Sequence, residues 1–89
     1  ADWTEYENVV DVGVHFAENL VNEEKAFLIH KFLHNMEEPY KEVFNLRVFG
    51  ELSYEKIGTL FQKSSGWARV TFYRAKKKIE EYMEEQGYE

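Results

Sequence analysis

The sequence of 89 residues contains no cysteine, only one proline and no long apolar run. Without cysteine, disulfide bonds and thiolate metal sites are excluded. No apolar stretch approaches the roughly 20 residues that span a bilayer, and no segment resembles a signal peptide, so we expect no membrane insertion. The chain begins with Ala1 rather than Met, from which we expect an excised fragment or a processed product.

The composition that remains is sufficient for a packed core. Hydrophobic residues make up 44% of the chain and aromatic residues 17%. A chain of this length and composition is typical of one small globular domain, and it argues against disorder of the whole molecule.

Acidic residues are also missing from residues 62–79, although the chain has a net charge of −6. The basic residues of this segment are Lys63, Arg69, Arg74, Lys76, Lys77 and Lys78. Residues 1–30 are strongly acidic, and residues 80–89 carry five glutamates. This separation of charge favours an anionic partner for the basic segment, but a solvated helix face that balances the acidic segments explains it equally well.

Apolar spacing and helix-end residues predict an all-α fold: a small four-helix domain over residues 22–86 with a C-terminal helix-turn-helix. It is preceded by an extended linker over residues 1–21, which show no sustained helical period, and followed by a disordered tail over 87–89. The predicted helices run from an Asn22 cap to near Asn35, from near Glu38 with Pro39 in the first turn to just before Gly50, from a Ser53 cap to Phe61, and from a Ser64 cap to about Met83 or Glu84.

The last predicted helix has two distinct faces. At about 100° per residue, its core-facing stripe consists of Ala68, Phe72, Ala75 and Ile79, extended by Tyr82 and Met83. The opposite face consists of Gly66, Val70, Tyr73 and Lys77, flanked by Arg69 and Arg74. Arginine can donate forked hydrogen bonds to guanine or phosphate, and a carboxylate on this face would repel phosphate. The acid-free run therefore suits a helix that lies in a phosphate-lined groove.

The start of this helix also suits an anion. Ser64, Ser65 and the first N–H groups can hold a phosphate. Trp67 could stack on a sugar–phosphate wall, or it could be partly buried and lock the turn; the sequence does not separate these two roles.

Other chemistry is weakly supported. His30 and His34 have the spacing of two metal ligands on a helix, but no third ligand motif accompanies them, so we expect no metal. No nucleophile and base are paired in the sequence, and Ser64 and Ser65 fit helix caps better than nucleophiles. We therefore expect no enzyme activity, no cofactor and no small-molecule substrate.

The stretch LSYEKIGTLFQKSSGWARVTFYRAKKKI, residues 52–79, resembles region 4 of sigma-70 family RNA polymerase sigma factors, most of all the extracytoplasmic-function (ECF) type. The stretch EPYKEVFNLR, residues 38–47, resembles the helix that precedes it in that family. The sequence departs from the family pattern at Gln62, where glycine is usual, and at Lys63. It also departs at Trp67–Ala68, Val70 and Thr71, where changes bear on the preferred DNA sequence.

The resemblance implies a bacterial, cytoplasmic protein that binds double-stranded promoter DNA in transcription initiation, with its last helix in the major groove of the −35 element. The base-reading residues would be Arg69, Val70, Tyr73 and Arg74. The DNA-backbone contacts would be Ser53, Tyr54, Lys63, Ser64, Ser65, Trp67, Lys77 and Lys78. Residues 1–21 would link to a missing N-terminal sigma domain, and further partners would be the β-flap of the RNA polymerase core and an anti-sigma factor.

Two alternatives stay open. The same helices could form a protein-interaction module, bound by an anti-sigma regulator or polymerase, with little DNA binding of its own. They could also belong to a related helix-turn-helix activator. The ending of the motif, Arg74 to Lys78, favours the sigma factor.

Overall fold

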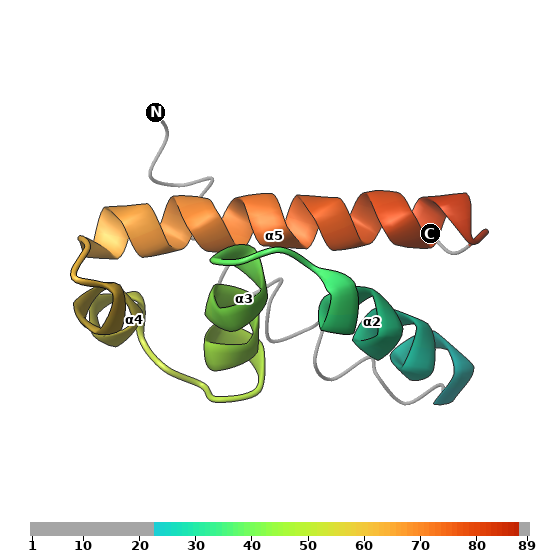
Figure 1. The fold of residues 1–89 in the computed structure, drawn as a ribbon, viewed down its shortest axis with the longest axis horizontal. Coiled ribbons are helices and arrows are strands. Elements are labelled where there is room, and N and C mark those ends of the chain that lie inside the picture. Colours follow the sequence, from blue (N-terminus) through green and yellow to red (C-terminus); the bar gives the residue numbers. More distant parts are fainter. Residues whose placement is uncertain (1–22, 88–89) are drawn as a thin grey trace.

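The computed structural model describes residues 23–87, and this part of the chain is all-helical, with no strand. The helices are α2 (Glu23–Asn35), α3 (Tyr40–Val48), α4 (Tyr54–Phe61) and α5 (Ser65–Glu85). Figure 1 shows α2, α3 and α4 along one flank of the long α5, and each of the three packs against it. The expected all-α domain with a C-terminal helix-turn-helix is confirmed. The predicted linker over 1–21 lies outside the described residues, as does most of the predicted tail.

Side-chain caps start the two helices of the helix-turn-helix where the sequence predicts them. The Ser53 hydroxyl accepts the N–H of Lys56 at 3.2 Å, and the Ser64 hydroxyl accepts the N–H of Trp67 at 3.0 Å. Each bond satisfies one of the N–H groups that a helix start leaves without an intrahelical acceptor. The second bond therefore fixes where α5 begins relative to α4.

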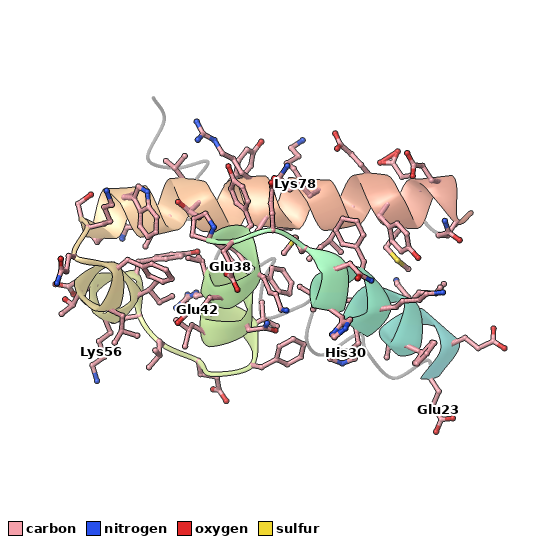
Figure 2. The ribbon with its side chains drawn as sticks, viewed as in Figure 1. Glu23, His30, Glu38, Glu42, Lys56 and Lys78 are labelled. Atoms are coloured by element: carbon pink, nitrogen blue, oxygen red, sulfur yellow. The ribbon has the colours of Figure 1, made fainter. Side chains whose placement is uncertain are left out.

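The beginning of α3 differs slightly from the prediction. Pro39 lies at the N-cap position instead of within the first helical turn, and the helix begins at Tyr40. The Glu38 carboxylate accepts the N–H of Glu42 at 3.0 Å, so Glu38 caps α3 from outside the helix. Figure 2 labels Glu38 just before α3 and Glu42 in its first turn, whereas Lys56 on α4 points away from α5.

Two left-handed residues lie in the connections, and neither is glycine. Glu51, after α3, has φ 56°, and Gln62, at the end of α4, has φ 59°. The predicted C-terminal glycine of α3, Gly50, is required for a different reason: a Cβ atom there would lie 2.8 Å from the carbonyl oxygen of Leu46. The left-handed turn after α3 therefore falls on the next residue.

The strain at Gln62 gives a first testable expectation. A left-handed conformation costs an L-residue roughly 1–2 kcal/mol, and glycine avoids this cost. Part of that gain is offset because glycine gives the unfolded chain more conformational freedom. Gln62→Gly should therefore raise the free energy of unfolding by about 0.5–1 kcal/mol, measured by urea unfolding. The matched control is Gln86→Gly, at a helix end with φ −87°, which should not stabilise the domain. Equal effects of the two substitutions would contradict the strain argument.

The core lies where α2, α3 and α4 meet α5. The predicted stripe of α5 is confirmed, since Ala68, Phe72, Ala75 and Ile79 are fully buried and Met83 is nearly so. The Phe72 ring stacks on Phe44 of α3 with centroids 5.5 Å apart and lies 6.1 Å from the Tyr54 ring of α4. Because α5 is anchored along this stripe, its opposite side faces away from the other helices (Figure 1).

Candidate nucleic-acid interface

The turn between α4 and α5 is held by a close backbone approach. A Cβ atom on buried Gly58 would lie 2.7 Å from the carbonyl oxygens of both Lys63 and Ser64. The N–H of Lys63 donates to the carbonyl of Gly58 at 2.7 Å. Only glycine leaves room for this contact, which brings the start of α5 directly onto α4. The two helix starts are thereby held in one fixed arrangement.

The side of α5 opposite the core carries the predicted base-reading residues. Arg74 and Lys77 are exposed, and Val70 and Tyr73 are half-buried. The ammonium group of Lys77 lies 5.6 Å from the centre of the ring of Tyr73, which precedes Lys77 by one helical turn. Glu80 begins the acidic end of the helix, so the exposed surface between Ser65 and Ile79 is positive and partly apolar. Such a surface can receive phosphates and base edges together.

Arg69 lies at the edge of this face and turns toward α4. Its guanidinium carbon is 5.3 Å from the centre of the Tyr54 ring. Arg47 of α3 approaches the same ring at 4.4 Å and donates from Nη1 to the carbonyl oxygen of Leu52 at 2.8 Å. The sequence did not single out Arg47; an arginine at the end of an amphipathic helix gives only a weak signal for this role.

The burial of Tyr54 limits how it could make the expected DNA-backbone contact. Its side chain is only 5% exposed and its hydroxyl is buried, so that side chain does not reach a phosphate outside the domain. Burial raises the pKa of Tyr54 above its usual value, and the charges of Arg47 and Arg69 oppose the rise. The hydroxyl therefore stays protonated at neutral pH. As the first residue of α4, Tyr54 can offer DNA only its backbone.

The other expected backbone contacts fall into two groups. Ser53, Lys63 and Ser64 are exposed around the two helix starts, and Ser65 is half-buried beside them. Lys78 differs: its ammonium lies 3.5 Å from Oε1 of Glu37 and 5.0 Å from the centre of the Tyr40 ring. It is engaged on the side of α5 that faces α3, so a phosphate contact there would have to compete with Glu37.

Trp67 packs within the helix-turn-helix itself. Its ring lies 5.1 Å from that of Phe61, the last residue of α4, and it is half-buried against the core. This contact supports a role in locking the turn.

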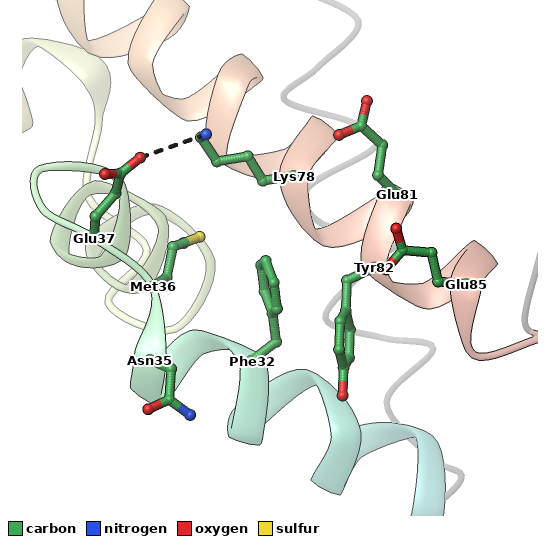
Figure 3. Close-up of a pocket in the computed structure, with 8 residues that line it drawn as sticks. All are labelled: Phe32, Asn35, Met36, Glu37, Lys78, Glu81, Tyr82 and Glu85. Carbon is green, nitrogen blue, oxygen red and sulfur yellow. Dashed lines mark ion pairs between the residues drawn. The ribbon is translucent and has the colours of Figure 1, made fainter.

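A shallow groove of about 450 Å³ lies at the far end of α5, against α2 (Figure 3). Its floor contains Phe32 and Tyr82, whose rings stack with centroids 4.6 Å apart. The charged residues that line it are Glu37, Lys78, Glu81 and Glu85. Three carboxylates against one ammonium make the groove unfavourable for phosphate, so it does not extend the positive surface at the other end of α5.

The part of the chain that the structure describes contains no group of three or more His, Cys, Asp or Glu side chains placed to hold a metal ion. Nor, among the same residues, is any helix long and apolar enough to cross a membrane.

Comparison with known proteins gives one match. The family model described as "Sigma-70, region 4" matches residues 26–79, which is more than half of the chain. The match includes all of α3 and α4 and most of α2 and α5. No curated protein and no solved structure matches the chain.

Proposed function

The chain belongs to the sigma-70 region 4 family, and from that premise we propose that it binds the −35 element of a promoter as part of an ECF-type sigma factor. In sigma factors, region 4 contacts promoter DNA and RNA polymerase. The chain would thus help to direct polymerase to the start of a gene. It acts by binding, and we propose no catalytic step.

The observation that carries this proposal is the exposed, acid-free side of α5. Arg74 and Lys77 are exposed on it, Val70 and Tyr73 lie half-buried on the same side, and Arg69 lies at its edge. In the major groove, arginine can read guanine through two hydrogen bonds, while Val70 and Tyr73 offer apolar contact to thymine methyl groups. An α-helix fits this groove, and the core on the opposite side of α5 leaves this face open.

The two helix starts supply the positioning contacts. Ser53 and Ser64 cap α4 and α5, and the N–H groups near each cap add a partial positive charge. Lys63 lies in the turn between α4 and α5, and Lys77 is exposed on α5 one helical turn after Tyr73. Contacts of this kind fix the register of the protein on DNA without reading its sequence.

Protein partners would bind other surfaces. Phe27 is 68% exposed and Phe49 43% exposed, and His30 joins them by stacking on Phe49 with centroids 5.4 Å apart. His30 lies one helical turn after Phe27, so the three side chains form a continuous exposed patch on α2 and the end of α3. Exposed aromatic groups of this kind suit a protein interface. We assign to this patch contact with the β-flap of RNA polymerase or with an anti-sigma factor.

Salt dependence tests whether DNA is the partner of the basic face. The chain first selects a preferred duplex from a random pool. A plot of the logarithm of its association constant against the logarithm of the salt concentration should then have a slope of about −0.9 for each phosphate neutralised. Lys77→Ala should reduce this slope by about 1. The control is Lys31→Ala, which removes an exposed cation of α2 and should leave the slope unchanged.

These binding curves can be followed by fluorescence anisotropy. A flat dependence on salt, or a failure of the pool to yield any bound duplex, would favour the protein-interaction module over DNA binding.

A further inference from the structure

Two arginine guanidinium groups lie over the ring of Tyr54, that of Arg47 at 4.4 Å from the ring centre and that of Arg69 at 5.3 Å. The two arginines come from α3 and α5, while Tyr54 itself begins α4. The ring also borders Phe72 of the core. One buried ring thus connects three helices at the point where the basic face of α5 begins.

We propose that Tyr54 is a positioning residue for DNA binding, which holds the guanidinium of Arg69 toward the DNA side of the helix-turn-helix. The proposal rests on the proposed function, in which Arg69 contacts DNA. Tyr54 does not touch the nucleic acid; its effect passes through Arg69. This role replaces the phosphate contact that the sequence suggested for the same residue.

A free arginine side chain has many rotamers. A guanidinium is planar and is attracted to the face of an aromatic ring. The Nε atom of Arg69 is buried, so hydrogen bonds to DNA would come from its two terminal nitrogens. An arginine that is already held in this way loses less conformational freedom when it binds. At 5.3 Å from the ring centre, Arg69 is within the distance at which this attraction is significant.

Arg47 fixes the ring from the other helix. Its guanidinium lies closer, at 4.4 Å, and it is tied to the Leu52 carbonyl in the segment just before α4. The ring therefore cannot shift freely with Arg69. Both positive charges also lie near the start of α4, where the helix dipole adds to the positive potential. A DNA phosphate, or an acceptor atom on a base edge, suits this positive potential.

The test is a double-mutant cycle on the chain, with the duplex selected by the unsubstituted chain. Tyr54→Phe keeps the ring and should bind within about twofold of the unsubstituted chain. Tyr54→Leu removes the ring face and should weaken binding about five- to tenfold. Tyr54→Leu combined with Arg69→Ala should be no weaker than Arg69→Ala alone, because the ring then has no arginine to position.

Arg74→Ala supplies the matched control, since Arg74 is exposed on the same helix and the guanidinium groups over the Tyr54 ring are those of Arg47 and Arg69. Tyr54→Leu and Arg74→Ala should weaken binding independently, with multiplied effects. Multiplied effects with Arg69→Ala as well would overturn the positioning role, because Tyr54 would then act by another route. No effect of Arg69→Ala alone would instead refute the assignment of Arg69 in the proposed function.

A measurement on the free protein covers the case in which Tyr54→Leu fails to fold. In the folded, unsubstituted chain, the side-chain protons of Arg69 should show ring-current shifts in NMR spectra, and Tyr54→Phe should preserve them. Random-coil shifts for these protons would overturn the proposal without any DNA.

Discussion

Phe72→Ala is expected to lower the free energy of unfolding by about 3–5 kcal/mol, the cost typical of removing a fully buried phenylalanine. Phe72 has no exposed surface, and its ring contacts aromatic rings of both α3 and α4. The substitution removes apolar burial and leaves a cavity where the three helices meet. For a domain with a total stability of about 5–15 kcal/mol, this loss is a large part of the free energy of unfolding.

Urea unfolding followed by circular dichroism measures this effect. Val70→Ala is the matched control, because Val70 lies on the same helix two residues away and is half-buried on the outward side. It should cost less than about 1 kcal/mol. If Phe72→Ala fails to fold, Phe72→Leu keeps much of the volume and should show a smaller loss in the same direction. An unchanged transition in Phe72→Ala would refute the burial of this ring and with it the orientation of α5.

Local sequence patterns were sufficient to predict the helices and the orientation of α5. The step of three and four residues from Ala68 to Ile79 describes one side of a helix, and that side is buried. Ser53 and Ser64 precede helices because their hydroxyl groups accept N–H groups three residues later. These features depend on neighbours within a few residues, which the sequence shows directly.

Some features were missed, most of them because they depend on distant residues. The pattern after α3 placed a C-terminal glycine at Gly50, but the left-handed residue is Glu51, and Gly50 is instead needed where the backbone passes close to Leu46. In the sequence, Tyr54 has the position of an exposed residue in the first turn of a helix. In the fold, residues of α3 and α5 bury it. Lys78 belongs to a run of lysines in the sequence, yet in the fold it meets Glu37 from the connection before α3. No periodicity predicts such a pair.

The charge of α5 is therefore less uniform than its sequence. Lys76 pairs with Glu80 at 2.6 Å and is mostly covered, and Lys78 pairs with Glu37. Arg74 and Lys77 are the exposed cations of the helix, and Arg69 is held at its edge. Of the six basic residues in the acid-free segment, these three and Lys63 are the best placed for DNA.

Arg74→Ala is expected to weaken binding to the preferred duplex by about 1–3 kcal/mol and to relax the choice of base at one position, as loss of a forked contact to guanine would. Arg69→Ala should weaken binding by a similar amount. Lys78→Ala should have a much smaller effect, because its ammonium is already engaged with Glu37. Lys31→Ala again controls for the loss of a positive charge elsewhere.

Selection of DNA sequences from a random pool by each variant, followed by anisotropy measurements on the preferred duplex, separates these roles. Loss of base preference in Arg74→Ala with retained salt dependence identifies a base-reading residue, whereas a uniform loss across sequences identifies a phosphate contact. Unchanged binding in both arginine variants would refute the placement of this face in the major groove. If Lys78→Ala lost as much binding free energy as Arg74→Ala, the ion pair between Lys78 and Glu37 would have to open on DNA. Positive charge alone, and not exposure on α5, would then determine which residues contact DNA.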